Sequence, residues 1–203
     1  MRTRGLVCAV VSAVAIAATA VPTGAAEFEA ENPWFERGFG AVTALAATGE
    51  HLLVASGSTL SRTTPMGGGS VLTTVAGGVI DHGASDGTMV AWARSIQNEL
   101  KAIPIGGGAT STLPLATGSW PTGLAMTPGT LWVLDSGHDR VGAIELDGGG
   151  FGTAVFRTLG FEPSHLAVDP AGPVWVSGVD GTVQQLEFDG SWSVTSTGTV
   201  DPG

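Results

Sequence analysis

The chain has 203 residues, with 18 acidic and 8 basic side chains and a formal net charge of −10 at pH 7. This acidity excludes proteins that hold nucleic acid or an anionic membrane surface by charge, because both are themselves negative. The single cysteine, Cys8, excludes an internal disulfide and a metal site built from several cysteines.

The first 26 residues have the three parts of a secretory signal peptide. Arg2 and Arg4 precede the apolar run Gly5–Val21, and the small residues Gly24-Ala25-Ala26 form a cleavage site. The alternative is an uncleaved anchor, but a membrane-spanning helix needs about 20 apolar residues. We therefore expect a secreted, extracellular protein that makes no membrane contact after cleavage.

The mature chain would begin after Ala26 and have 177 residues, with six basic against 18 acidic side chains and a net charge of −12. That length suffices for one domain with a buried core. Cys8 lies too early in the apolar run for a lipidated cysteine. The single lysine and the wealth of alanine and glycine indicate a bacterial source.

Residues 27–40 differ from the rest in being both acidic and aromatic. They form either a leader whose aromatic side chains pack on the first repeat or an extra strand that closes a ring against the last repeat. The sequence leaves both interpretations open.

A motif that begins at Pro121 returns further along the chain. Residues 163–167 repeat residues 121–125 after 42 positions, and Val174-Trp175-Val176 repeats Leu131-Trp132-Val133 after 43. Weaker copies precede Pro121. Four repeats result, over residues 41–78, 79–120, 121–161 and 162–203.

Each repeat contains short apolar runs separated by turn residues. The copy from Pro121 has three, Leu124–Met126, Leu131–Leu134 and Val141–Leu146. A period near ~40 with about four short strands is typical of a β-propeller blade, which is stable only when it packs on neighbouring blades. The sequence predicts an all-β propeller of four-stranded blades, as either a compact four-blade ring or an incomplete one.

The second repeat is the least regular. Residues 95–103 could hold a helical turn, but the period favours a loop followed by a strand.

The pattern from Pro121 to Val141, with Leu131-Trp132-Val133 followed by Asp135-Ser136-Gly137, resembles an NHL-type propeller repeat. It is similar to repeats of the gluconolactonase/SMP-thirty and streptogramin-lyase propellers. The resemblance is clear over residues 121–190 and fainter over 41–120. It implies a propeller fold more than any one function.

The resemblance also implies catalytic sets, which this sequence does not complete. Lactonase-like propellers hold a divalent metal with Glu, Asn and Asp, but the mature chain has only Asn32 and Asn98, neither at a first-strand start. Streptogramin lyases use a His at a first-strand start and a Glu just after the Trp-containing strand. His165 matches that His, but no Glu follows Trp175 over residues 176–179.

Candidate binding residues stand where the first strand of a repeat begins or the second strand ends. Those points lie at the same end of an up-and-down sheet. Counting two repeats of 42 back from His165 leads to Asp81. The candidates are His165, Glu162, Asp135, His138, Asp139, Asp81, His82 and Asp180.

Carboxylates and imidazoles at one end could hold a hard cation or supply a general base. The sequence establishes no cofactor, and a divalent cation is the candidate that these side chains suggest. The alternative for Asp135-Ser136-Gly137 and Asp180-Gly181 is an ordinary turn, in which Asp bonds its own backbone.

Three tryptophans, Trp92, Trp132 and Trp175, recur at spacings of 40 and 43 and are predicted to pack between blades. Trp120 and Trp192 fall outside those strands and are predicted to be exposed. The sequence thus favours a binding or scaffolding protein for a small molecule or an extracellular protein. The alternative is a metal-dependent lactonase-like hydrolase or a streptogramin-lyase-like enzyme.

Overall fold

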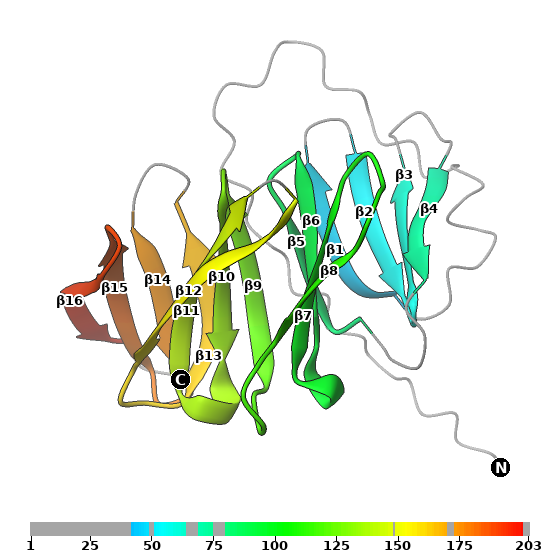
Figure 1. Cartoon of the computed structure of the whole chain (residues 1–203). Helices are drawn as coiled ribbons and strands as arrows, with labels where there is room; N and C mark the ends of the chain where they lie inside the picture. Colours follow the sequence, from blue (N-terminus) through cyan, green and yellow to red (C-terminus); the bar gives the residue numbers. More distant parts are fainter. Residues whose placement is uncertain are drawn as a thin grey trace, which may run out of the picture. The chain divides into compact units, whose positions relative to one another are not determined.

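The computed structural model describes residues 42–48, 51–63, 69–74, 80–147, 149–169 and 173–200. Within these ranges the chain forms four antiparallel four-stranded sheets, which we call sheets A to D in chain order. Each sheet lies within one predicted repeat, and its strands pair in the order in which they follow along the chain. The prediction of an all-β fold of four-stranded blades is confirmed (Figure 1).

The strand bounds are as follows. Sheet A contains β1 (Val42–Thr48), β2 (His51–Ser56), β3 (Thr59–Thr63) and β4 (Gly69–Thr74). Sheet B contains β5 (His82–Ser85), β6 (Met89–Arg94), β7 (Glu99–Pro104) and β8 (Ser111–Pro114). Sheet C contains β9 (Pro121–Thr127), β10 (Thr130–Asp135), β11 (Arg140–Asp147) and β12 (Gly150–Thr158). Sheet D contains β13 (Pro163–Val168), β14 (Val174–Gly178), β15 (Thr182–Phe188) and β16 (Trp192–Thr199).

The second strands β6 and β10 are apolar along almost their whole length. Every residue of β6 is buried, and in β10 only Thr130 is not. A strand buried on both faces needs apolar side chains at consecutive positions rather than at alternate ones. The continuous apolar runs in the sequence therefore mark strands that lie between two other sheets.

The core consists of three apolar clusters, one for each pair of successive sheets. Leu53 and Ala55 of sheet A meet Val90 and Trp92 of sheet B. Sheets B and C share a second cluster, and sheets C and D a third. The first strands also contact one another in the order β1, β5, β9, β13, whereas no comparable contact joins sheets A and D within the described ranges. The sheets therefore follow one another without closing on themselves.

Successive side chains of a strand point to opposite faces, so each second strand serves two clusters at once. In β6, Trp92 faces sheet A while Ala91 and Ala93 face sheet C. Trp132 of β10 faces forward to sheet D. The two tryptophans thus pack between sheets, as predicted, but on opposite faces of their strands.

Two of the tryptophan predictions were wrong. Trp175 has 40% of its surface exposed, because it faces forward from sheet D, where no further described sheet covers it. Trp192, predicted to be exposed, packs on Trp132 with ring centroids 5.7 Å apart. Trp120 is 54% exposed, as predicted.

The irregular stretch in the second repeat contains both a helical turn and a strand. A 3₁₀ turn, η1 (Ser95–Gln97), ends at Asn98, whose φ of 51° is left-handed, and β7 follows directly. A second 3₁₀ turn, η2 (Ser136–His138), occupies the same place in sheet C and ends at Asp139 with φ of 47°. Asparagine and aspartate tolerate this conformation better than most residues with a side chain.

The predicted signal peptide, residues 1–26, and the predicted leader, residues 27–40, lie outside the described residues. Among the residues that are described, no helix has the length and apolar character that crossing a membrane requires.

Candidate functional site

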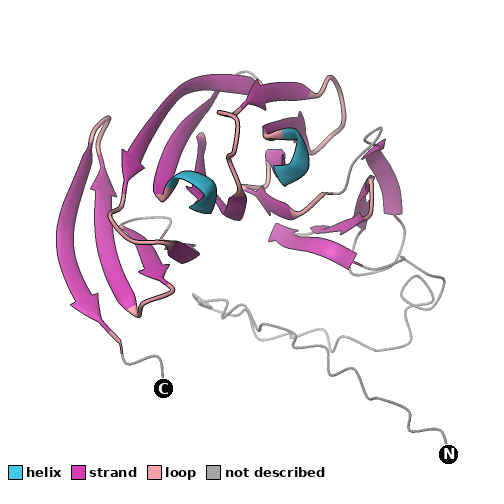
Figure 2. Ribbon diagram, turned by 90° about the horizontal axis from the view of Figure 1, so that it is seen from below, coloured by secondary structure: helices cyan, strands magenta, loops and turns pink. Residues whose placement is uncertain are grey.

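The two 3₁₀ turns η1 and η2 lie at the same end of the sheets, which we call the η face (Figure 2). In sheet C, Pro121 at the start of β9 pairs with Asp135 at the end of β10, and Asp135 pairs with Arg140 at the start of β11. Pro163 and Gly178 form the corresponding pair in sheet D. The expectation that first-strand starts and second-strand ends share one end therefore holds for these sheets.

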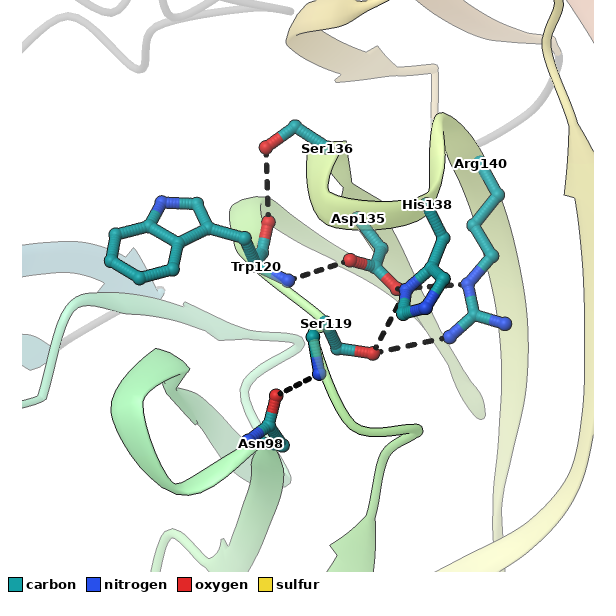
Figure 3. A network of polar contacts seen from close by, with 8 residues as sticks. Asn98, Ser119, Trp120, Asp135, Ser136, His138 and Arg140 are labelled. Atoms are coloured by element: carbon teal, nitrogen blue, oxygen red, sulfur yellow. Dashed lines mark hydrogen bonds and ion pairs between the residues drawn. The ribbon is translucent and has the colours of Figure 1, made fainter.

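Asp135 is the centre of a buried polar network on this face (Figure 3). Its side chain is fully buried. Oδ1 accepts the backbone N–H of Trp120 at 2.7 Å, and Oδ2 accepts the Arg140 Nε–H at 2.8 Å. The Nδ1 of His138 lies 3.3 Å from the same Oδ2. Both carboxylate oxygens are thus occupied by groups of the chain itself, which gives Asp135 a structural role.

Arg140, the ion-pair partner of Asp135, makes two further contacts. Its Nη2 donates to Ser119 Oγ at 3.2 Å, and its guanidinium lies 4.1 Å from the centre of the Phe156 ring. A guanidinium at this distance over an aromatic face is attracted to the ring. The network therefore ties the loop before β9 to β10, β11 and β12.

Two opposing effects act on the pKa of Asp135. Burial raises it, but the hydrogen bonds from Trp120, Arg140 and Ser119, together with the charge of Arg140, outweigh burial and lower it below the usual value. A carboxyl whose pKa is lower in the folded protein stabilises the fold above its unfolded pKa, and this stabilisation is lost as the pH falls through the folded value.

We expect the free energy of unfolding to change little between pH 7 and about 5 and to decline below about pH 4. Urea denaturation across this range measures the decline. Asp86, Asp180 and Asp189 also have lowered pKa values, so wild type must be compared with Asp135→Asn. The variant should be less stable at pH 7 and should show a shallower decline. Parallel pH profiles for the two proteins would contradict the assignment.

Sheet B contains the same ion pair with its charges inverted. Arg94 at the end of β6 pairs with Glu99 at the start of β7, across η1. In sheet C the acid ends the second strand and the base begins the third, across η2. The two repeats thus brace the same turn with opposite arrangements of charge.

The backbone of Trp120 is fixed by the turn that follows β10. Ser136 donates both its N–H and its hydroxyl to the Trp120 carbonyl, at 3.1 and 3.2 Å. Gly137 allows this approach, since a Cβ there would collide with the Gly118 carbonyl oxygen. The indole points away from Asp135, His138 and Arg140 (Figure 3) and is 54% exposed. The face therefore presents an aromatic ring on a backbone held in place.

Two further apolar side chains are exposed in the turns that follow second strands. Ile96 in η1 is 73% exposed, and Val179 in the loop between β14 and β15 is 59% exposed. The turn that carries Ile96 is joined to the segment that carries Trp120. Asn98 Oδ1 accepts the Gly118 N–H at 3.0 Å, and Ser95 Oγ donates to the Pro121 carbonyl at 3.3 Å. The sequence did not lead us to predict Ile96 or Val179 as binding residues. Each lies directly after a second strand, and that position could have indicated them.

The ladder register corrects one alignment. His82 pairs with Ala93 and His165 with Ser177, and each partner is the second-last residue of its second strand. His82, rather than Asp81, is thus the counterpart of His165, because the spacing between equivalent residues is 41 in one repeat and 42 in the next. Asp81 instead accepts the Ser95 N–H at 2.8 Å. Burial lowers the pKa of His82, and the charge of Asp81 offsets part of that effect.

The candidates of sheet D are exposed. His165 Nδ1 lies 3.0 Å from Ser164 Oγ, whose hydroxyl donates to the Ser177 carbonyl. The side chain of Glu162 is exposed as well. Asp180 accepts the N–H and the hydroxyl of Thr182 at 2.9 Å each, and these bonds lower its pKa. Asp180 therefore has the role of an ordinary turn residue.

The structure places all eight candidates at the η face but does not bring them into one cluster. Within the parts of the chain that are described, no three His, Cys, Asp or Glu side chains lie close enough to hold a metal ion. Asp139 is exposed in its left-handed turn, and His138 is bound to Asp135. The exposed candidates are His165, Glu162, His138, Asp139 and Asp180.

No protein-family model matches this chain, and no curated protein matches its sequence. Solved structures do resemble it. Virginiamycin B lyase from Staphylococcus aureus aligns with 78% of this chain at 14% identity and a TM-score of 0.64. A candidate 6-phosphogluconolactonase from Bacteroides fragilis aligns with 79% at 16% identity and a TM-score of 0.62. The Cps50 (Swd1) β-propeller domain of Myceliophteria thermophila aligns with 77% at 11% identity and a TM-score of 0.60.

The chain has a β-propeller fold. At these identities the likeness shows the fold alone, and the chain spans between 56% and 58% of the length of these three structures.

Proposed function

We propose that this protein is a secreted NHL-type propeller that binds an extracellular partner through its η face. The observation that carries the proposal is the exposure of Trp120, Ile96 and Val179 at one end of the sheets. Aromatic side chains are enriched among the residues that dominate binding energy. The partner would be a small molecule or an extracellular protein.

The way Trp120 is anchored supports this role. Two hydrogen bonds to its carbonyl and one from its N–H hold the backbone, while the ring remains exposed. A ring presented on a fixed backbone loses little conformational freedom when it is covered, and binding then costs less entropy. The arginines at this end, Arg94 and Arg140, are engaged with Glu99 and Asp135, so the exposed charges nearby are those of acids.

Peptides selected from a displayed random library against the purified protein test the proposal. We expect them to bind the η face and to lose at least about tenfold in affinity when Trp120 is replaced by alanine, about 1.4 kcal/mol. Trp175→Ala is the matched control, because Trp175 is also an exposed tryptophan but lies away from the η face. Peptides that bind Trp120→Ala as tightly as wild type would count against the η face.

The second candidate function is that of an enzyme, and the exposed position of His165 favours it. His165 is exposed near the start of a first strand, and its Nδ1 lies 3.0 Å from the Ser164 hydroxyl. Similar folds include a protein named as a lyase and one named as a candidate lactonase. The reaction would then be the opening of a lactone by hydrolysis or elimination.

Thermal unfolding with Ca²⁺, Mg²⁺, Mn²⁺ and Zn²⁺, combined with turnover assays on lactones and streptogramins, separates the two candidates. A bound cation at one hundred times its dissociation constant should stabilise the fold by about 2.7 kcal/mol. Stabilisation by one cation together with turnover that His165→Ala abolishes would establish the enzyme. Absence of both would leave the binding protein.

A further inference from the structure

The exposed residue Glu162 stands at the position that Trp120 occupies one repeat earlier. Each of the two directly precedes the first strand of its sheet, β13 or β9. The Trp120 carbonyl accepts the N–H of Ser136 at 3.1 Å, and the Glu162 carbonyl accepts the N–H of Val179 at 3.0 Å. Strands β9 and β13 contact each other. The sheet next to the exposed ring of Trp120 thus presents a carboxylate at the equivalent place.

A second exposed carboxylate belongs to the turn that holds the backbone of Trp120. Asp139 ends η2, and Ser136 at the start of η2 donates to the Trp120 carbonyl. Neither the Asp139 nor the Glu162 side chain makes a hydrogen bond or ion pair with any residue that the structure describes. Both carboxylates therefore remain available to a partner, unlike that of Asp135.

The basic side chains do not balance these carboxylates. Of the five in the described ranges, Arg62 lies at the opposite end of its sheet, near the end of a third strand. Three are held in ion pairs, Arg94 and Lys101 with Glu99, and Arg140 with Asp135. Arg157 pairs with Val141 of the cluster between sheets C and D, so it faces that cluster, and its Nε is buried. The charge that the η face offers a partner is therefore negative.

The sheet before Trp120 presents an apolar, uncharged turn. Ile96 in η1 is 73% exposed, and none of the three residues of η1 is charged. Asn98 follows η1 in the left-handed conformation that Asp139 adopts after η2, so an amide stands where sheet C has a carboxylate. The η face thus changes from apolar at sheet B to acidic at sheets C and D, with Trp120 between them.

We propose that the partner of the η face is a cationic peptide segment of an extracellular protein. The inference rests on the proposed function and names the chemistry of the partner. A lysine or arginine of the segment lies over the Trp120 ring, where a cation is attracted to the aromatic face, and basic side chains pair with Asp139 and Glu162. An apolar side chain of the segment covers Ile96.

The free carboxylates favour a cationic partner over a neutral or acidic one. A partner that covers Trp120 also removes water from around Asp139 and Glu162, and a carboxylate that loses water without gaining a counter-charge destabilises the complex. An acidic partner would in addition be repelled by the net charge of −10 of the chain. A basic segment replaces the lost water with ion pairs, and the same charge steers its approach.

The spacing of the sheets sets the length of the segment. Packed sheets lie about 10 Å apart, and an extended chain advances about 3.3 Å per residue. An extended segment of about six residues therefore reaches from Ile96 in sheet B to Glu162 in sheet D. Random peptides of about seven residues are long enough to make all of these contacts.

Selection from a displayed library of such peptides against the purified protein tests the inference. Binding is measured at pH 8, where a histidine side chain is ordinarily neutral, because His138 and His165 are also exposed at this end. Peptides that lose at least about tenfold in affinity for Trp120→Ala should carry on average at least about two more basic than acidic residues. Unselected peptides from the library should show no such excess.

Replacing both free carboxylates, as Asp139→Asn with Glu162→Gln, should lower the affinity of these peptides about fivefold in about 0.1 M NaCl. In about 1 M NaCl, which screens charges beyond about 3 Å, wild type and this variant should bind alike. An asparagine keeps the turn, since Asn98 adopts the same conformation after η1. The matched control, Asp147→Asn with Glu187→Gln, removes two exposed carboxylates at the opposite end of sheets C and D. It should change the affinity less than about twofold.

Three results would overturn the inference, and they separate it from the proposed function. Peptides that require Trp120 but carry no excess of basic residues would defeat the cationic partner and leave the proposed function standing. Peptides that bind Trp120→Ala as tightly as wild type would defeat both. Equal losses in the two double variants would show that only the total charge of the chain matters, and would defeat the roles of Asp139 and Glu162. Circular dichroism checks that every variant folds.

Discussion

Replacing Asp135 by alanine should lower the free energy of unfolding by about 3 kcal/mol, because it leaves the partners of a buried carboxylate without their acceptor. The Nε–H of Arg140 and the N–H of Trp120 both lose a hydrogen bond of 2.8 Å or less. Removing one member of a buried charged pair costs more than the pair contributes, since the other charge stays away from water. Urea denaturation at pH 7 measures the loss.

A double-mutant cycle with Arg140→Ala tests the cause. If the two residues act as one unit, the double variant should be more stable than the sum of the single losses predicts, by at least about 1 kcal/mol. Losses that simply add would show that Asp135 and Arg140 are not coupled. Glu162→Ala, which removes an exposed carboxylate near the same end, should change stability by less than about 0.5 kcal/mol.

The second large effect is expected at Trp132. Its ring packs on Phe188 and Trp192, and its Nε1–H donates to Thr127 Oγ1 at 3.0 Å. Trp132→Ala should cost about 3–5 kcal/mol, because it opens a cavity between sheets C and D. Differential scanning calorimetry at low protein concentration gives the loss.

Trp175→Ala is the control for the same residue type at the same strand position. It should cost less than about 1 kcal/mol, because the ring is already 40% exposed. Equal losses for the two variants would show that Trp132 stabilises the strand itself rather than the packing of sheet D on sheet C.

The repeat and the strands could be predicted because both depend on local pattern. Turn residues recur at a nearly constant period, and the apolar runs between them have strand length. In the third repeat the predicted runs Leu124–Met126, Leu131–Leu134 and Val141–Leu146 all lie within β9, β10 and β11. The up-and-down order of the strands also predicted that the candidate residues lie at the same end of the sheets.

What could not be predicted depends on partners distant in the sequence. Trp132 and Trp175 occupy the same position of the repeat, and only the sheet that follows decides which one is buried. Asp135 reads as a turn residue, yet its partners include Trp120, 15 residues earlier. The predicted equivalence of Asp81 and His165 was wrong because the repeats differ by one residue in spacing. A shift of one residue along a strand moves a side chain to the other face of the sheet.

The inverted ion pairs of sheets B and C also bear on how the chain finds its fold. Adjacent repeats of similar sequence can exchange strands while folding, which is a common error of repeat proteins. If β6 paired with β11 in place of β7, Arg94 would face Arg140; if β10 paired with β7, Asp135 would face Glu99. Like charges directly opposite each other destabilise a strand pair. Only the native neighbours bring opposite charges together, so the inversion lets the chain distinguish two otherwise similar hairpins.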